Sequence, residues 1–324
     1  MKKKLIDIKD LTIQFPKKNS RLFEMKREKF NAVDHVSFYI KKGETFGLVG
    51  ESGSGKSTVG LSILRYHTPF CGEIRYDGTD IARLNNKELL PYRKKMQSVF
   101  QDPYSSLNPG MTVLDIIAEP MRIHKIGTRK EREERAAELL ETVGLTKKDL
   151  LKYPHEFSGG QRQRISIARA LCVHPEFILC DEPISALDVS LQTQIIELLE
   201  ELQDKMGLTY LFISHQLQVV EKICDEIGVM YLGSLLEISD RKKLFAAPLH
   251  PYTRLLLSAM LVPDPHVDSL ANIKEDTGNR QYREKGCKFA LRCPYAEERC
   301  QCSRPELIEV EEGHFVACFQ YKGR

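Results

Sequence analysis

GESGSGKST, from Gly50 to Thr58, sets the architecture expected of this chain. It follows the short apolar run Thr45–Val49, which predicts a buried strand, and it matches the phosphate-loop pattern G-x-x-x-x-G-K-[ST]. Glycines at these positions let backbone N–H groups close around phosphate oxygens, at the positive end of the helix that follows. The stretch therefore predicts a strand, a phosphate-binding loop and a helix in direct succession.

Individual residues of this loop have predicted chemical roles. Lys56 is expected to reach the β- and γ-phosphates of a nucleotide, and the Ser57 hydroxyl is expected to ligate magnesium. The other candidate phosphate-binding residues are Gly50, Ser52, Gly53, Ser54, Gly55 and Thr58. A simple glycine turn is the alternative interpretation, and the strand before the loop argues against it.

A second motif, FILCDEP, spans Phe177 to Pro183. Its four apolar residues predict a strand that carries Asp181 to its end, where the carboxylate is a candidate magnesium ligand. Adjacent carboxylates on an extended segment point in opposite directions. Glu182 is therefore expected to be free to polarise an attacking water as a general base.

Strand-like and helix-like segments alternate along the first 260 residues. Apolar or alternating runs predict strands, and apolar residues at helical spacing predict helices. The predicted strands are 5–15, 33–40, 45–49, 96–100, 177–180 and 209–214, and the longest predicted helices are 129–143 and 191–206. The alternation predicts an α/β fold with a mostly parallel sheet covered on both faces. After Gln101, Pro103 to Gly110 are expected to form an extended loop.

The composition excludes some classes of protein. Lys and Arg number 48 against 45 Asp and Glu, so the net charge of +3 gives no strong field to attract nucleic acid. No run of about 18 apolar residues is present, so the sequence predicts no membrane-spanning helix. Asp7, Lys9 and Asp10 interrupt the apolar segment that a signal peptide needs, which predicts a protein of the cytosol with reduced cysteines.

SGGQRQRISIARA, from Ser158 to Ala170, resembles the signature of ABC ATPases, and the resemblance covers nearly the whole chain. It implies an ABC ATPase domain at 1–265, with a mostly parallel core, an antiparallel β subdomain and an α-helical subdomain at about 102–165. In this family the signature of one subunit caps ATP on the phosphate loop of another. The capping residues here are Ser158, Gly159, Gly160 and Gln161. The resemblance thus implies ATP, Mg²⁺ and a sister ATPase in a heterodimer.

Further residues take roles from the same resemblance. Gln101 looks like the glutamine that contacts magnesium and senses the membrane partner. Ser185–Asp188 looks like the D-loop, so Asp188 joins the candidate site residues. His215, after the predicted strand 209–214, looks like the switch histidine that contacts the γ-phosphate.

An aromatic side chain near the first strand stacks on adenine in this family. Phe15 is the first candidate, and Phe23 and Phe30 stay open because an inserted basic segment blurs the alignment. The chain departs from the family pattern at two positions. Phe157 stands where leucine is usual, and Gln216 stands where aspartate is usual. Neither position has a direct chemical role, so hydrolysis is still expected.

The tail resembles a more specific group. HPYTRLLLSAMLVPDP (His250–Pro265) and GCKFALRCPYAEERC (Gly286–Cys300) resemble the C-terminal extension of ATP-binding subunits in oligopeptide and dipeptide importers, most closely the F-type subunit. The extension is expected at 266–324. The resemblance implies two membrane permeases, an external substrate-binding protein and a place at the cytoplasmic face of the membrane. Importers of nickel, glutathione and some oligosaccharides share this tail, so peptide is the first expectation and these are alternatives.

Four cysteines of the tail match the family positions: Cys287, Cys293, Cys300 and Cys318, while Cys302 is extra. Their spacing is neither the paired C-x2-C of most structural zinc sites nor the compact ferredoxin run. Related importers hold a [4Fe-4S] cluster on these cysteines, so the resemblance implies one. Reduced thiols and zinc stay open as alternatives.

An ABC ATPase that acts on nucleic acid, with the tail as a zinc finger, is the alternative from another class. Such proteins usually contain two ATPase domains or a long coiled coil between the motifs, and this chain has neither. The near-neutral charge also argues against it. The sequence therefore favours a transport ATPase that binds no nucleic acid.

Overall fold

The computed structural model describes residues 2–17, 29–261 and 285–321 and divides into two compact units. The first unit comprises Met1–Leu5, Ile40–Thr45 and Arg83–Ile213, and the second comprises Ile6–Tyr39, Phe46–Ala82 and Ser214–Arg324. Among the described residues, no helix has both the length and the apolar character needed to cross a membrane.

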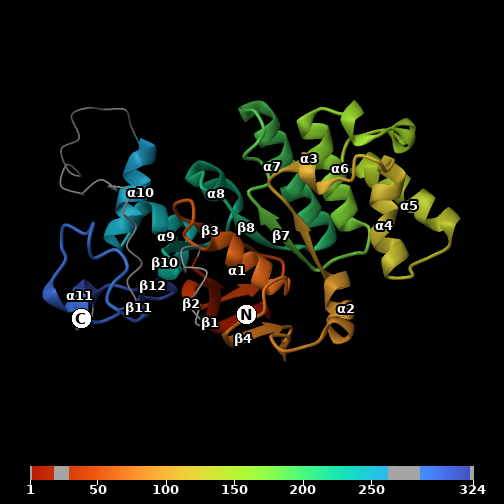
Figure 1. Cartoon of the computed structure of the whole chain (residues 1–324). Helices are drawn as coiled ribbons and strands as arrows, with labels where there is room; N and C mark the ends of the chain where they lie inside the picture. The colour runs from red at the N-terminus through yellow and green to blue at the C-terminus, as the bar shows by residue number, and fades with distance from the viewer. Residues whose placement is uncertain (1, 18–28, 262–284, 322–324) are drawn as a thin grey trace. The chain divides into compact units, whose positions relative to one another are not determined.

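Three parallel strands form the centre of the first unit (Figure 1). They are β6 (Met96–Val99), β7 (Phe177–Asp181) and β8 (Thr209–Ile213). Phe177 in β7 lies opposite both Met96 and Thr209, so β7 is the middle strand. All five residues of β8 and the first four of β7 are buried, as expected of strands covered on both faces.

Helices surround these strands, and α4, α5 and α6 contact one another. The helices of the first unit are α2 (Asn86–Lys95), α3 (Pro103–Ser106), α4 (Val113–Ile123), α5 (Arg129–Thr142), α6 (Gly159–Leu171) and α7 (Val189–Met206), with the 3-10 turns η1 (Lys147–Leu151) and η2 (Pro154–Glu156).

The second unit contains an antiparallel sheet in the order β2-β1-β4-β5. Its strands are β1 (Lys4–Pro16), β2 (Lys29–Lys41), β4 (Cys71–Tyr76) and β5 (Thr79–Asp80). In the same unit β3 (Thr45–Val49) runs parallel to β9 (Glu226–Tyr231). Antiparallel pairing then adds β10 (Ser234–Asp240), β12 (His314–Val316) and β11 (Ile308–Glu311). The helices are α1 (Lys56–Ile63), α8 (Leu217–Ile223), α9 (Arg241–Ala246), α10 (Pro251–Leu261) and α11 (Glu298–Cys302), with the 3-10 turn η4 (Phe319–Tyr321).

The predicted α/β class and the predicted strands and helices are confirmed, with ends that differ by a few residues. The boundary between residues 265 and 266 lies outside the described residues. The extents 1–265, 266–324 and about 102–165 for the helical subdomain therefore stay predictions.

One local prediction is wrong. The segment after Gln101 is not extended throughout, because Pro103–Ser106 form the short helix α3. The Asp102 carboxylate accepts the Tyr104 N–H at 2.8 Å and caps the helix, and Pro103 at the first helical position needs no acceptor for a backbone N–H. Proline is common in loops, but at this position it starts a helix.

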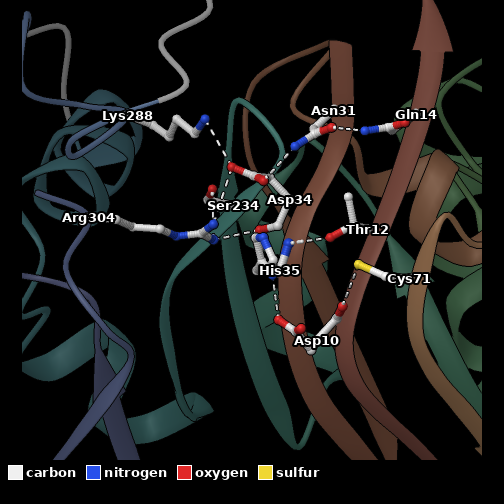
Figure 2. Close-up of polar contacts among 10 residues, drawn as sticks. All are labelled: Asp10, Thr12, Gln14, Asn31, Asp34, His35, Cys71, Ser234, Lys288 and Arg304. Carbon is white, nitrogen blue, oxygen red and sulfur yellow. Dashed lines mark hydrogen bonds and ion pairs between the residues drawn. The ribbon is translucent and has the colours of Figure 1, made fainter. Parts of the chain in front are cut away.

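Within the second unit, a buried carboxylate fixes the C-terminal extension to β2 (Figure 2). Asp34 Oδ2 lies 3.0 Å from Lys288 Nζ and 3.2 Å from Arg304 Nη1, and Asn31 donates to Oδ1 at 2.9 Å. The Asp34 N–H donates to Gly233 O at 2.8 Å. Burial opposes ionisation, but the Lys288 ammonium outweighs it and holds the pKa of Asp34 below its ordinary value. Two cations of the extension thus order the segment around Asp34.

A second buried carboxylate joins β10, β12 and the start of α10. Glu237 Oε1 lies 2.7 Å from His314 Nε2, and both side chains are almost fully buried. The same carboxylate accepts the Leu249 and His250 N–H groups, each at 2.8 Å. Glu237 therefore satisfies three donors that would otherwise be buried without partners.

We expect His314→Ala to lower the free energy of unfolding by about 3 kcal/mol, because it leaves a buried carboxylate oxygen short of a charge-assisted partner. Denaturant unfolding of the full chain measures the change. Glu133→Gln is the control, since its pair with Arg129 is exposed and its loss is expected to cost less than about 0.5 kcal/mol. Equal losses in the two variants would contradict the assignment.

His250 makes the stability of the fold sensitive to acid. Burial lowers the pKa of His250 to about 4, with Glu237 opposing the shift and Arg254 adding to it. The neutral ring accepts the Tyr252 N–H at Nδ1 over 3.0 Å. Between pH about 6.5 and 4 the unfolded chain therefore binds more protons at this residue than the folded chain. Stability from His250 is complete above that range and is lost as the pH falls through it.

As the pH falls from about 6.5 to 4, the free energy of unfolding should decrease in both chains. We expect the decrease to be about 1 to 3 kcal/mol smaller in His250→Asn than in the parent chain. Asparagine keeps an acceptor for the Tyr252 N–H and does not titrate. Denaturant unfolding at a series of pH values compares the two chains. Parallel curves for the two would show that His250 does not titrate between these values.

Candidate nucleotide site

The phosphate loop lies between β3 and α1, as predicted. Gly55 stands at the N-cap of α1 with φ 103°, and a Cβ there would meet Ala32 O at 2.5 Å, so only glycine fits. Ser54 O accepts the Gly233 N–H at 2.9 Å. The loop thus packs against the segments around Ala32 and Gly233 in the same unit. Asp34 lies two residues after Ala32, and its N–H donates to Gly233 O. Ser52, Gly53 and Ser57 are exposed, which leaves the loop open to a ligand.

Lys56 is held over the loop by backbone oxygens. Its side chain is buried, and Nζ donates to Gly50 O at 2.8 Å, to Glu51 O at 2.9 Å and to Ser54 Oγ at 3.4 Å. A buried ammonium needs such acceptors. Phosphate oxygens are stronger acceptors than neutral carbonyls because they are charged. The arrangement therefore suits exchange of loop carbonyls for a phosphate chain.

Glu51 has two partners that sequence reasoning missed. Its N–H donates to Tyr252 Oη at 3.0 Å, and its Oε1 atom lies 2.8 Å from Arg292 Nη1. Both partners lie in the tail, Tyr252 in the segment 250–265 and Arg292 in the segment 286–300. The sequence gives no sign that these segments reach the phosphate loop, because Tyr252 and Arg292 lie 201 and 241 positions from Glu51.

Aromatic rings gather near the first strand. Phe15 is partly buried, and its ring centroid lies 5.1 Å from that of His67, edge to face, and 6.3 Å from that of Phe30. Burial lowers the pKa of His67, which favours its neutral ring. Two of the three adenine candidates therefore lie side by side, and His67 is an addition. Phe23 lies outside the described residues.

In the first unit β7 carries Asp181 to its end, as predicted, but Glu182 is not extended. Glu182 has φ 49°, and its N–H donates to Ile213 O at 3.0 Å. The chain therefore leaves the extended conformation between the two carboxylates, so alternation along a strand does not describe them. A positive φ is rare outside glycine and is concentrated at functional sites. Both carboxylates are only partly buried.

Ser158 is the N-cap of α6, so the signature stretch lies at a helix N-terminus. Ser158 Oγ accepts the Gln161 N–H at 3.4 Å, and Gln161 Oε1 accepts the Ser158 N–H at 3.0 Å. Both residues are exposed, so this positive helix end faces solvent. Phe157, one of the two departures from the family pattern, is a buried apolar residue.

The remaining candidates lie at element ends. Gln101 is exposed and stands between β6 and α3. Asp188 caps α7 by accepting the Leu191 N–H at 3.0 Å and the Ser190 hydroxyl at 2.7 Å, which lowers the pKa of Asp188. His215 is exposed, directly after Ser214, whose Oγ accepts the Gln216 N–H at 2.9 Å.

The candidates fall into two sets. Phe15, the loop 50–58 and His215 belong to the second unit. Gln101, the signature 158–161, Asp181, Glu182 and Asp188 belong to the first.

Four cysteines of the extension line one small cavity. Cys287, Cys293, Cys300 and Cys318 surround about 20 Å³ together with His250 and Tyr295. Gly286, with φ 85°, lets the Cys287 N–H reach Cys300 O at 2.8 Å, where a Cβ would meet that oxygen at 2.7 Å. Burial raises the pKa of Cys287 to about 12, and the other three thiols add to the rise. Cys302 is exposed and lies outside the cavity wall.

Four thiols suit a thiophilic metal, but the cavity between them is smaller than an iron–sulfur cluster in this structure. Its volume is about that of one water molecule. In the part of the chain that the structure describes, no group of three or more His, Cys, Asp or Glu side chains is arranged to hold a metal ion. The [4Fe-4S] cluster and its zinc alternative therefore stay predictions.

Comparison with known proteins matches both parts of the chain. The ABC transporter family matches residues 33–185, and the family of the oligopeptide/dipeptide transporter C-terminal region matches residues 236–300. Over 320 residues the chain is 51% identical to the oligopeptide transport ATP-binding protein OppF of Bacillus subtilis (strain 168), covering 98% of this chain and 97% of that protein. The chain is also 48% identical over 321 residues to the oligopeptide transport ATP-binding protein AppF of Bacillus subtilis (strain 168). That alignment covers 98% of this chain and 97% of that protein.

A solved structure agrees with this likeness. The dimeric, post-hydrolysis structure of the ATP-binding cassette MJ0796, bound to ADP and Pi, aligns with a TM-score of 0.64 at 31% identity. The alignment covers 73% of this chain and 98% of that one.

Proposed function

The chain belongs to the ATP-binding subunits of oligopeptide and dipeptide ABC transporters, and on this premise we propose how it energises peptide import. The observation that carries the proposal is similarity along nearly the whole length, at about 50% identity, to proteins named for oligopeptide transport. A phosphate loop with a buried lysine supplies the matching chemistry.

ATP is proposed to bind along the loop 50–58, with Lys56 and backbone N–H groups on its phosphates and Phe15 on its adenine. Ser57, Gln101 and Asp181 are proposed to hold Mg²⁺, and His215 to contact the γ-phosphate. In hydrolysis a water attacks the γ-phosphorus, the bond to ADP breaks, and the water loses a proton. Glu182 is the proposed acceptor of that proton.

The signature is proposed to act on a second ATPase. Ser158 and Gln161 are exposed at the N-terminus of α6, and this helix end suits the γ-phosphate of ATP held by a sister subunit. ATP would then close a head-to-tail heterodimer, and hydrolysis would reopen it. Asp188, at the exposed start of α7, is proposed to lie at the same interface.

The membrane partners are proposed to contact α3. Tyr104 is 62% exposed there, and the Arg162 guanidinium of α6 lies 3.9 Å from its ring centroid. Arg169, also on α6, donates to Ser106 O at 2.7 Å. Force on α3 would therefore reach the helix that begins with the signature. We propose that the chain lies at the cytoplasmic face of the membrane, beneath two permeases that receive the solute from an external binding protein.

Peptide is the proposed solute, because the two relatives reported above are named for oligopeptide transport. Nickel, glutathione and oligosaccharide remain alternatives for the same ATPase role, since the solute meets the permeases and the binding protein rather than this chain.

We also propose that the four clustered thiols bind a thiophilic metal, with a [4Fe-4S] cluster first and zinc second. The support is that all four family-position cysteines line one cavity whereas Cys302 does not. The cavity must widen to admit a cluster.

We expect Glu182→Gln, in the complete transporter, to lower ATP turnover about 100-fold or more while the ATP Kd changes less than about twofold, because the amide cannot accept the proton. Phosphate release and nucleotide titration measure the two quantities. Glu201→Gln, an exposed position on α7, is the control and should leave both unchanged. Normal turnover in Glu182→Gln would refute its assignment as the base.

We expect the chain, purified without oxygen, to contain iron and sulfide and to absorb light at about 400 nm. The four-site variant with serine at 287, 293, 300 and 318 should lose both signals, and Cys302→Ser should keep them. Stoichiometric zinc without the band would select the alternative metal. Colourless, metal-free protein would contradict metal binding.

A further inference from the structure

The C-terminal extension reaches the phosphate loop through one arginine. Arg292 Nη1 lies 2.8 Å from Glu51 Oε1 and 3.3 Å from Tyr231 Oη. The guanidinium also lies 5.6 Å from the ring centroids of both Tyr231 and Phe289. The Arg292 and Glu51 side chains are 15% and 27% exposed, so the pair is largely withdrawn from water. All four residues belong to the second unit.

The position of Arg292 is set by a packed turn rather than by a free side chain. Phe289 is fully buried and packs on Tyr231 and Tyr252, with ring centroids 5.5 and 5.4 Å apart. The Arg292 and Cys293 N–H groups both donate to Phe289 O at 3.0 Å. Burial opposes the charge on Arg292, but hydrogen bonds to Tyr231 and Glu51 outweigh it and raise the pKa of Arg292. The arginine therefore presents a fixed, permanent cation to the loop.

Glu51 is fixed at three points at the start of the loop. Its side chain pairs with Arg292, its N–H donates to Tyr252 Oη, and its carbonyl accepts from Lys56 Nζ. The same carbonyl accepts the Ser54 N–H at 3.1 Å. The conformation of Glu51 therefore sets the course of the loop up to Ser54 and the resting position of the lysine.

The charge of Glu51 matters as much as its position. A phosphate chain carries several negative charges, and an unpaired carboxylate in the loop that binds it would repel it. Arg292 neutralises this carboxylate from a largely desolvated position, where a guanidinium–carboxylate contact is strong.

We propose that Arg292 is a positioning residue for ATP binding: by holding and neutralising Glu51, it makes the C-terminal extension part of the nucleotide site of its own subunit. The inference rests on the proposal that the loop 50–58 binds ATP. It adds to that proposal a contribution from a segment about 240 residues away along the chain.

The test is a double-mutant cycle on ATP binding by the full-length chain, measured by calorimetric titration with MgATP well below the unfolding temperature. We expect Arg292→Ala to raise the ATP Kd about tenfold and Arg292→Lys to raise it by less, because lysine keeps the charge but not the planar fork. In a Glu51→Ala background, Arg292→Ala should change the Kd by less than about twofold, because the charge it neutralises is gone.

Arg299→Ala is the matched control, since Arg299 lies in the same extension and its described partners, Glu297 and Phe319, belong to the extension too. It should leave the ATP Kd unchanged. An unchanged Kd in folded Arg292→Ala, or an equal loss with and without Glu51, would overturn the inference. If Arg292→Ala does not fold, Arg292→Gln, which keeps a hydrogen-bond donor for Glu51 but removes the charge, takes its place: an ATP Kd no higher than that of the parent chain overturns the inference.

Lys56→Ala separates failure of the inference from failure of the proposed site. Loss of ATP binding in Lys56→Ala together with a normal Kd in Arg292→Ala would sink only the role of Arg292. Normal binding in Lys56→Ala would instead show that the loop is not the site, and the role of Arg292 would fall with it.

Discussion

A buried ammonium at the start of a helix constrains much of the second unit. Lys56 needs oxygen acceptors, and the loop supplies them from Gly50, Glu51 and Ser54. This loop conformation requires glycine at position 55, because a Cβ there would meet Ala32 O at 2.5 Å. The segments that hold the loop, around Ala32 and Gly233, must therefore be ordered themselves.

The C-terminal extension supplies part of that order. Lys288 and Arg304 fix Asp34, whose N–H bonds to Gly233, and Gly233 in turn bonds to Ser54. Arg292 reaches the loop directly, and the next residue, Cys293, lines the cysteine cavity. One turn of the extension thus contacts both the phosphate loop and the four-thiol cavity. The extension is an integral part of the second unit rather than an appendage to it.

Short-range patterns predicted what depends on neighbouring residues. Three elements depend on residues only a few positions apart and can therefore be inferred from the sequence. They are the loop 50–58, the strand that ends at Asp181 and the helix N-terminus at Ser158. Predictions were wrong where the same residue type is compatible with two local backbone conformations. Pro103 starts a helix instead of a loop, and Glu182 leaves the extended conformation because its N–H bonds to Ile213 on the adjacent strand.

The sequence by itself determined the fold class, the nucleotide chemistry and the kind of transporter, because the motifs that encode them are local and distinctive. Only the tertiary structure decided which distant residues serve the loop. Arg292 and Tyr252 lie more than 200 positions from Glu51, and no periodicity or spacing connects them to it. Their contacts arise from packing around Phe289 and Tyr231, and packing partners are specified by the shape of the whole unit rather than by any segment of the chain.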